Sequence, residues 1–338
     1  MTQTAKALVA PGKGILAADE STPTMRKRLA AIGLESIEER RRAYREILFT
    51  TEGIGQFISG VILFDETLRQ RASDGSAFLE VLRDRGVIPG IKVDKGTSPL
   101  AGFPGELVTE GLDGLRDRLA EYASMGARFA KWRAVVSIGE ERPSSTGIEA
   151  NAHVLARYAA LSQEAGLVPV VEPEVLMDGP HSLERHGEVT AATLRALYEH
   201  LARHRVVLEA SLLKPNMVLS GTEHAVQAGL DEVAEATIGV LRQTVPAAVP
   251  GIVFLSGGQS DEEATASLDA INRRAPQPWG LSFSFGRALQ APVLRVWAGE
   301  EANRRSAQAA LVHRAAMNGA ARHGQYRPDM EQLATSPT

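Results

Sequence analysis

Seven lysines stand out among the 37 basic residues of this chain, because the other thirty are arginines. Arginine stays charged in proteins, whereas a buried lysine amine can lose its proton and attack a carbonyl carbon to form a Schiff base. Lysines inside apolar segments are therefore candidates for covalent chemistry, although a compositional bias alone would also leave a few of them. The seven are Lys6, Lys13, Lys27, Lys92, Lys95, Lys131 and Lys214.

Lys214 is the strongest candidate nucleophile. It is the only ionisable residue in the run from Ser211 to Met217, which reads S-L-L-K-P-N-M. Burial and a neighbouring cation both lower the pKa of an amine, by up to ~3–5 units on full burial, and we expect Lys131 to supply that cation. The alternative is a lysine that extends along an apolar surface to reach solvent.

Two further pairs of charged residues have the spacing of neighbours on one face of a strand. Lys131 with Arg133, and Glu172 with Glu174, are each two residues apart, so each pair is expected to point to one side. Schiff-base chemistry needs an acid to expel hydroxide and a base for a later proton transfer. We assign the acid to Glu172, and to Asp19 the removal of a substrate hydroxyl proton. Structural ion pairs are the alternative.

The elements that must position these residues are short β-like runs alternating with longer helical stretches. Helices are expected over Leu112–Met125, Asn151–Glu164, Glu188–His204, Asp261–Arg274 and a C-terminal region from Ala288 to about Arg322. Strands are expected over Gly14–Ala18, Gly60–Phe64, Gly90–Val93, Phe129–Arg133, Val168–Pro173, Ser211–Lys214, Ile252–Leu255 and Leu281–Phe285.

Eight β-then-α units predict an α/β fold of the closed (β/α)8 TIM-barrel type, with the active site at the carboxyl ends of the strands. An open doubly wound sheet is the alternative, but the composition does not change between the two halves. We expect a single barrel domain over residues 1–325, followed by a polar, mobile tail over residues 326–338.

Two glycine-containing loops follow the last two predicted strands. The first contains Ser256, Gly257 and Gly258, and the second is Ser284-Phe285-Gly286-Arg287. Barrels commonly bind phosphate in these loops through backbone N–H groups and a helix N-terminus, and an arginine adds a charge-assisted contact. The cations gathered at one barrel mouth of a net-acidic chain predict an anionic substrate; they are Lys92, Lys131, Arg133, Lys214 and Arg287.

Composition excludes several other classes of protein. The net charge of −4 argues against nucleic acid or an anionic membrane as a main partner. The absence of cysteine excludes a thiol nucleophile, a Cys-ligated metal and a disulfide scaffold. No apolar run approaches the roughly 18 residues of a membrane span, and the N-terminus is a poor signal peptide. We expect a soluble protein of a reducing compartment.

Several motif-like features do not indicate a site. Gly12–Ala17 matches the dinucleotide pattern G-x-G-x-x-A but leads into a strand instead of following one. Lys13 is followed by glycine, so the Walker lysine pattern is absent. His200 and His204 are four residues apart without the H-E-x-x-H pattern, so surface histidines are expected. No metal and no cofactor are predicted.

Taken in order, the motifs resemble class I fructose-1,6-bisphosphate aldolase. The resemblance runs from about Val9 to Tyr326 and rests on long segments: Gly12–Ser21, Gly90–Gly96, Phe129–Arg133, Val171–Glu174, Leu212–Met217, Phe254–Ser260 and Ser284–Leu289. It implies a metal-free (β/α)8 enzyme of glycolysis and gluconeogenesis. Such an enzyme cleaves fructose 1,6-bisphosphate reversibly into dihydroxyacetone phosphate and glyceraldehyde 3-phosphate through a lysine Schiff base.

Carried over motif by motif, the resemblance implies a role for each position. Lys214 is the Schiff-base lysine, Glu172 the main acid and base with Glu174 assisting, and Asp19 and Lys131 lie on catalytic positions. The implied ketone-side phosphate site consists of Ser256, Gly257, Gly258, Ser284, Gly286 and Arg287. The further substrate contacts are Lys92, Arg133 and Arg28, the last on a mobile loop after the first strand. A cytoplasmic homotetramer is the family default.

One departure from the family pattern affects the mechanism. Many members end in a catalytically important tyrosine, whereas this chain ends in Ser336-Pro337-Thr338 and its last tyrosine is Tyr326. We therefore expect another group or water to perform the proton exchange that the family's tail assists. The alternatives left open are a Schiff-base barrel acting on a different sugar phosphate, a non-catalytic scaffold with an aldolase shell, and a metal-dependent aldolase.

Overall fold

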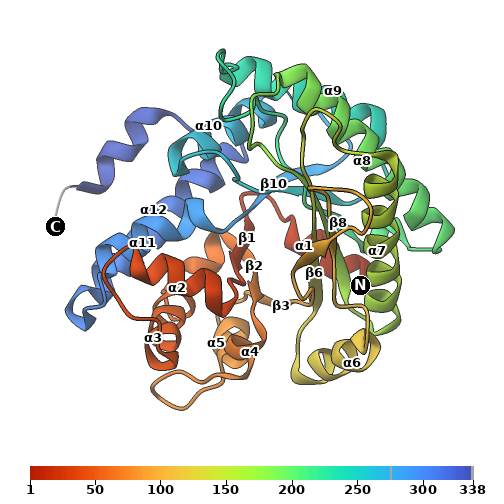
Figure 1. The fold of residues 1–338 in the computed structure, drawn as a ribbon. Coiled ribbons are helices and arrows are strands. Elements are labelled where there is room, and N and C mark those ends of the chain that lie inside the picture. Colours follow the sequence, from red (N-terminus) through yellow and green to blue (C-terminus); the bar gives the residue numbers. More distant parts are fainter. Residues whose placement is uncertain (275, 336–338) are drawn as a thin grey trace.

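Eight parallel strands close into a barrel in the computed structural model, which describes residues 1–274 and 276–335 (Figure 1). The order around the barrel is β1-β10-β9-β8-β7-β6-β3-β2. Helices on the outside connect the strands, so the predicted (β/α)8 barrel is confirmed. The barrel strands are β1 (Gly14–Ala18), β2 (Ile58–Leu63), β3 (Ile88–Lys92), β6 (Phe129–Val136), β7 (Val168–Val175), β8 (Leu212–Leu213), β9 (Gly251–Phe254) and β10 (Gly280–Phe285).

Serine caps set the beginnings of three outer helices. Ser144, Ser182 and Ser260 each accept a hydrogen bond from the backbone N–H three residues ahead, which satisfies a donor that the first helical turn leaves free. Two of these helices therefore begin earlier than predicted. The helices are α1 (Thr2–Leu8), α2 (Thr22–Ala30), α3 (Glu38–Phe49), α4 (Asp65–Arg69), α5 (Phe78–Asp84), α6 (Leu115–Met125), α7 (Ser145–Glu164), α8 (Leu183–Arg203), α9 (Leu230–Thr244), α10 (Asp261–Asn272), α11 (Arg287–Trp297) and α12 (Arg304–Ala321).

Two parts of the chain depart from the predicted alternation. A small antiparallel hairpin, β4 (Thr97–Pro99) and β5 (Leu107–Thr109), is inserted between β3 and α6. The C-terminal helical region is broken into α11 and α12, because Ala298 and Gly299 both have positive φ angles, 51° and 86°. Neither feature moves a strand end, so the mouth of the barrel is unaffected.

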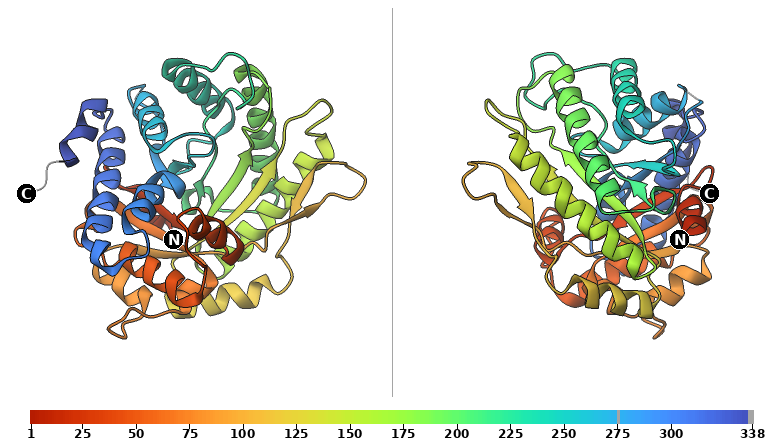
Figure 2. Two further views of the ribbon diagram at one scale, coloured as in Figure 1. Left: turned by 60° about the vertical axis from the view of Figure 1, so that its left-hand side comes forward. Right: turned by 90° about the vertical axis from the view of Figure 1, so that its right-hand side faces the viewer.

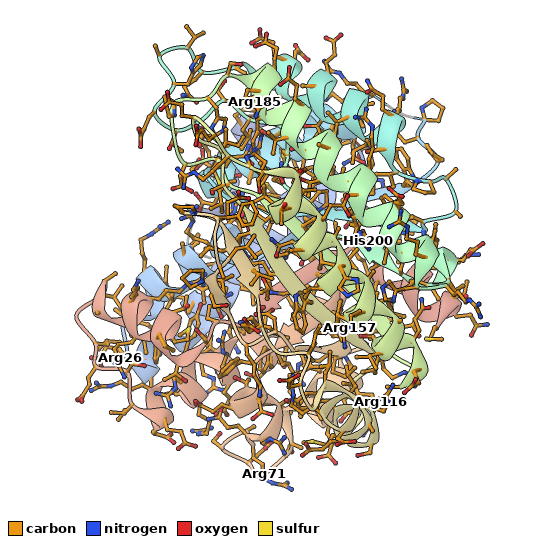
Figure 3. The ribbon with its side chains drawn as sticks, turned by 45° about the vertical axis from the view of Figure 1, so that its right-hand side comes forward. Arg26, Arg71, Arg116, Arg157, Arg185 and His200 are labelled. Carbon is orange, nitrogen blue, oxygen red and sulfur yellow. The ribbon has the colours of Figure 1, made fainter. Side chains whose placement is uncertain are left out.

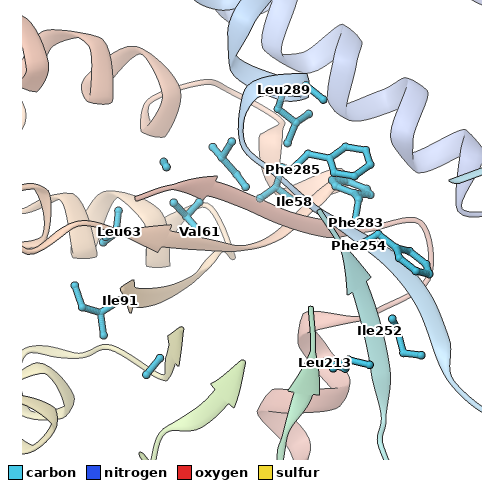
Figure 4. Packing of buried hydrophobic residues seen from close by; sticks show 14 of the residues in the cluster. Ile58, Val61, Leu63, Ile91, Leu213, Ile252, Phe254, Phe283, Phe285 and Leu289 are labelled. Carbon is cyan, nitrogen blue, oxygen red and sulfur yellow. The ribbon is translucent and has the colours of Figure 1, made fainter. Parts of the chain in front are cut away.

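The main hydrophobic core consists of apolar side chains packed between the barrel strands and the outer helices (Figure 4). Phe254, Phe283 and Phe285 are completely buried on β9 and β10. Gly14 gives the Phe283 ring its space, because a Cβ at that position would lie 2.6 Å from the ring. Gly14 thus begins a barrel strand and packs against an aromatic ring, which agrees with rejecting the dinucleotide motif.

The amino-terminal end of the barrel is closed by α1, shown in red in Figure 2. Ala5 and Leu8 of this helix are completely buried and cluster with Phe129 and Val168 at the starts of β6 and β7. The open end is therefore the carboxyl end of the strands, where the predicted site residues lie. No helix in the described ranges is long and apolar enough to cross a lipid bilayer.

The segment after residue 325 packs against the barrel for as far as its side chains are described. Tyr326 is buried, and its hydroxyl donates to Glu331 at 3.0 Å. Glu331 in turn pairs with His313 and Arg314 of α12. The backbone continues as a 3-10 helix, η4 (Pro328–Thr335), and residues 336–338 of the predicted mobile tail lie outside the described residues.

Glu46 joins α3 to α12 and predicts an acid-sensitive contribution to stability. Its buried carboxylate accepts hydrogen bonds from Ser73 and pairs with Arg42 at 2.6 Å and Arg304 at 3.1 Å. Burial alone raises the pKa of Glu46, but Ser73 and the two arginines outweigh it and lower the pKa from 4.5 to about 2. The stabilisation is therefore complete above about pH 4.5 and is lost as the pH falls toward 2.

We expect Glu46→Gln to lower the free energy of unfolding by about 2–3 kcal/mol at pH 7 and by clearly less at pH 3.5. Urea unfolding at the two pH values measures both losses. Glu39→Gln is the matched control, because Glu39 is on the same helix and also binds Arg42 but is exposed. Equal losses for Glu46→Gln at both pH values would contradict the assignment.

Candidate active site

Four charged side chains meet in the mouth of the barrel. Glu172 lies on β7, between Lys131 on β6 and Lys214 at the end of β8. Although β8 is only two residues long, the Lys214 N–H donates to the Val171 carbonyl at 2.8 Å and so continues the pairing with β7. Asp19 follows β1, which is not a neighbour of β6 or β7, and so reaches the group across the interior.

These four residues form one chain of ion pairs. Lys214 Nζ lies 2.9 Å from Glu172 Oε1, and Lys131 Nζ lies 3.0 Å from Glu172 Oε2. Lys131 Nζ also lies 2.6 Å from Asp19 Oδ2. The chain therefore runs Lys214–Glu172–Lys131–Asp19. Burial strengthens each contact, since the side chains of Lys214, Glu172 and Lys131 are at most 5% exposed.

The protonation states of this chain follow from its charges. Burial raises the pKa of Glu172, but Lys131, Lys214 and Arg133 outweigh it, so the net shift is downward. Burial also raises the pKa of Asp19, and the nearby lysines again lower it overall. Burial lowers the pKa of Lys131, but Asp19 and Glu172 outweigh burial, so the net shift of this pKa is upward. At neutral pH both carboxylates are ionised and Lys131 is charged.

The ionised state bears on the expected role of Glu172 as an acid. As an ionised carboxylate, it cannot act as an acid until it receives a proton. Lys214 Nζ lies 2.9 Å from Glu172 Oε1, so this pair has the geometry for a proton transfer. The arrangement allows Glu172 to accept a proton before it donates one.

A second set of pairs lies at the same rim. Arg133 pairs with Glu174, and Lys92 Nζ lies 3.1 Å from Asp94 Oδ1. Asp94 also accepts from the Arg133 backbone N–H at 3.3 Å, so it joins β3 to β6. Sequence reasoning did not assign Asp94 a role, although its spacing of two residues from Lys92 is the same signal that singled out the other pairs.

The predicted phosphate loops lie next to this chain of charges. The Leu255 N–H donates to the Pro215 carbonyl at 3.1 Å, which joins the loop after β9 to the segment that carries Lys214. Ser256 and Ser284 are buried, and among the described residues Ser284 Oγ has no hydrogen-bond partner. Gly286 caps α11, whose first residue is the exposed Arg287. The arrangement supplies a helix N-terminus, two hydroxyls and a guanidinium for an anion.

Close backbone approach explains the glycines of the first loop. A Cβ on Gly257 would lie 2.8 Å from Met177, and one on Gly258 would lie 2.4 Å from it. Gly258 also has a φ of +76°, which favours glycine. Packing at this rim therefore requires both glycines. Because glycine has no side chain, the backbone N–H groups of Gly257 and Gly258 are not shielded by a side chain on the same residue.

Arg28 lies within the helix α2 and not in a loop, where the sequence led us to expect it. Pro23 near the helix start and a run without glycine favour helix there. Arg28 pairs with Glu20, which also binds the buried Arg45 at 2.6 Å. Its Nη2 lies 3.9 Å from the point where a Cβ on Gly286 would stand, so Arg28 does reach the second phosphate loop.

The cavities of the molecule do not single out the mouth of the barrel. One of about 850 Å³ is at the closed end of the barrel, lined by Arg69, Arg83 and Arg128 among others. None of its lining residues belongs to the predicted site. The chemistry of the side chains, rather than cavity size, therefore locates the candidate active site.

Comparison with known proteins gives one consistent result. The family model described as "Fructose-bisphosphate aldolase class-I" matches residues 1–338. The chain is 58% identical over 328 residues to a probable fructose-bisphosphate aldolase class 1 of Xanthomonas axonopodis, covering 97% of this chain and 98% of the relative. It is 56% identical to the cytosolic fructose-bisphosphate aldolase 6 of Arabidopsis thaliana, over 94% of this chain and 89% of that one.

A solved structure gives the same comparison in three dimensions. It contains the fructose-bisphosphate aldolase of Plasmodium falciparum in complex with TRAP and a small-molecule inhibitor. The two chains superpose with a TM-score of 0.96 at 49% sequence identity, over 96% of this chain and 94% of that one.

Proposed function

This protein belongs to the class I fructose-bisphosphate aldolase family, and from this premise we propose that the ion-paired residues Lys214, Glu172, Lys131 and Asp19 perform its aldol cleavage. The protein is a carbon–carbon lyase of glycolysis and acts on a sugar bisphosphate. The reaction converts fructose 1,6-bisphosphate reversibly into dihydroxyacetone phosphate and glyceraldehyde 3-phosphate. The observation that carries the proposal is the contact of two buried lysines with opposite oxygens of Glu172, at 2.9 and 3.0 Å.

The first step forms the Schiff base, and its protons balance within the Lys214–Glu172 pair. The Lys214 ammonium gives a proton to Glu172, and the free amine attacks the ketose carbonyl carbon. A proton moves from nitrogen to the former carbonyl oxygen and gives a carbinolamine. Glu172 then returns its proton to that hydroxyl, which leaves as water and creates the iminium ion. Lys131 stays charged throughout and holds Glu172 in place.

The second step breaks the carbon–carbon bond. Asp19 takes the proton of the hydroxyl on the carbon that becomes the aldehyde, and the electron pair of the breaking bond moves to the iminium. Departure of the aldehyde leaves an enamine on Lys214. Protonation of the enamine carbon gives an iminium ion, and water hydrolyses this ion to release the ketone and regenerate Lys214. Asp19 suits this task because Lys131 keeps it ionised.

We propose substrate contacts on two opposite sides of the barrel mouth. Ser256, Gly257, Gly258, Ser284, Gly286 and Arg287 surround the ketone-side phosphate, with Arg28 beside Gly286. Lys92 and Arg133 are on the opposite rim, on β3 and β6, and serve the other phosphate; Glu174 positions Arg133. Two separate groups of cations agree with a bisphosphate rather than a monophosphate.

We expect the purified protein to cleave fructose 1,6-bisphosphate at an undiminished rate in excess EDTA, and to cleave fructose 1-phosphate at least ~10-fold less efficiently. A coupled assay for dihydroxyacetone phosphate measures both. Loss of activity in EDTA would contradict the metal-free mechanism. A preference for the monophosphate would point to a barrel that acts on a different sugar phosphate.

The assembly and location are proposed on the relatives alone. We propose a homotetramer, the family default, in the cytoplasm, which is supported by the cytosolic designation of an Arabidopsis relative at 56% identity. Static light scattering of the purified protein measures the number of subunits.

A further inference from the structure

Three histidines from two neighbouring helices form a cluster outside the active site. His153 lies on α7, His200 lies near the end of α8, and His204 directly follows α8. One ring nitrogen from each lies within 4.8 Å of the others. The ring centres of His153 and His200 are 5.7 Å apart, and those of His153 and His204 are 5.2 Å apart.

The fold brings these residues together for simple geometric reasons. His200 and His204 are four residues apart, so they lie on one face of the helical turn. That face packs against α7, and Figure 3 shows the labelled His200 on α8 beside the helix that carries Arg157. His153 is one turn before Arg157 on α7 and completes the group. Within residues 1–274 and 276–335, it is the one cluster of three such ligand residues at metal-binding separation.

The ligand chemistry is that of a borderline transition metal. Imidazole nitrogen is a common ligand of Zn²⁺, and three histidines with an open fourth position form a known type of zinc site. With Zn–N bonds of about 2.0–2.1 Å, tetrahedral ligands stand about 3.4 Å apart. Rotation of His153, the most exposed of the three, and of His204, which is half-buried, closes the remaining distance.

Two charged residues of α7 lie near the cluster. The charge of Arg157 opposes a cation, and Glu149, one turn before His153, offsets it.

Glu149 also orients one ligand. Its Oε2 lies 2.6 Å from Nε2 of His200, which leaves the other ring nitrogen of His200 for a metal. A carboxylate that holds a histidine in this way fixes the ring and increases its basicity. A cavity of about 450 Å³, lined by His204, Arg157 and Glu164 among others, opens beside the cluster and gives access from solvent.

We propose that His153, His200 and His204 bind one divalent transition-metal ion, Zn²⁺ in the first place, with Glu149 orienting His200 and water completing the coordination. The site lies on the outer helices, apart from the charged residues at the barrel mouth. It joins α7 to α8 toward the end of α8 that lies away from the mouth. These two helices follow β6 and β7, the strands that carry Lys131 and Glu172.

Isothermal titration of ZnCl₂ into the untagged, EDTA-treated and dialysed protein tests the proposal. We expect one ion per chain with a Kd on the order of 1 µM at pH 7.5, and a rise in Tm when zinc is added. His153→Gln and His204→Gln should each weaken binding at least ~10-fold and remove the rise in Tm, while Glu149→Gln should weaken binding less.

The matched control is His224→Gln, because His224 is half-buried, as His204 is, and lies outside the cluster. It should bind zinc as the unmodified protein does. Tm values measured in EDTA show whether each variant is folded, and the exposure of His153 makes that variant the decisive one. Absence of stoichiometric binding, or unchanged affinity in both His153→Gln and His204→Gln, would overturn the proposal.

Discussion

Replacing Lys214 by methionine is expected to reduce kcat for fructose 1,6-bisphosphate by at least ~10⁵-fold while leaving the fold intact. Methionine fills much of the same space but has no amine, so no iminium can form to accept the electrons of the breaking bond. Glu172 keeps its contact with Lys131 in this variant, so no buried carboxylate is left unpaired. The measurements are kcat in the coupled assay and the Tm of the variant.

Borohydride trapping locates the covalent bond directly. Dihydroxyacetone phosphate and borohydride are added in the presence of EDTA, and peptide mass spectrometry identifies the reduced adduct. We expect the adduct on Lys214, its absence in Lys214→Met, and its retention in the control Lys95→Met, since Lys95 is exposed at the same rim. An adduct on another lysine, or turnover without any adduct, would show that the nucleophile is misassigned. Absence of both adduct and turnover would favour the scaffold alternative.

The barrel could be predicted from the sequence because residues of the candidate site directly follow several of its apolar strands. Apolar runs followed directly by Asp19, Lys214 or Gly286 mark the carboxyl ends of strands, and β1 occupies the predicted range. The two-residue strand β8 is short because Pro215 follows Lys214, yet the backbone bond to Val171 keeps it in the barrel. The hairpin of β4 and β5 could not be predicted, because its strands are three residues long and lie outside the barrel.

The grouping of the candidate site residues was predictable from the sequence, but their protonation states were not. Spacing of two residues placed Lys131 and Glu172 on the inner face, and the structure confirms that they touch. Spacing gives no distance between strands, so it could not show that Lys131 lies between two carboxylates and that Glu172 is consequently ionised. The same limit applies to His153, which is 47 positions before His200 in the sequence and reaches it only through helix packing.

Replacing Asp19 by asparagine is expected to separate carbon–carbon cleavage from Schiff-base formation. Asparagine has nearly the same shape and can still accept a hydrogen bond from Lys131, but it cannot take a proton from the substrate hydroxyl. We expect kcat to fall by about 10²–10⁴-fold, the usual range for loss of a general base. Trapping with dihydroxyacetone phosphate should persist, because that ketone reacts with Lys214 without cleavage. The same preparation therefore gives both measurements.

Glu172→Gln is the matched comparison, since Glu172 binds the other side of Lys131. The Lys214 ammonium has no carboxylate acceptor at 2.9 Å in that variant, so trapping and cleavage should both fall. The contrast distinguishes the two carboxylates even though both contact Lys131. If Asp19→Asn lost trapping as severely as cleavage, then Asp19 would act on formation of the Schiff base, through Lys131 and Glu172. The base for the cleavage step would then be another group at the mouth.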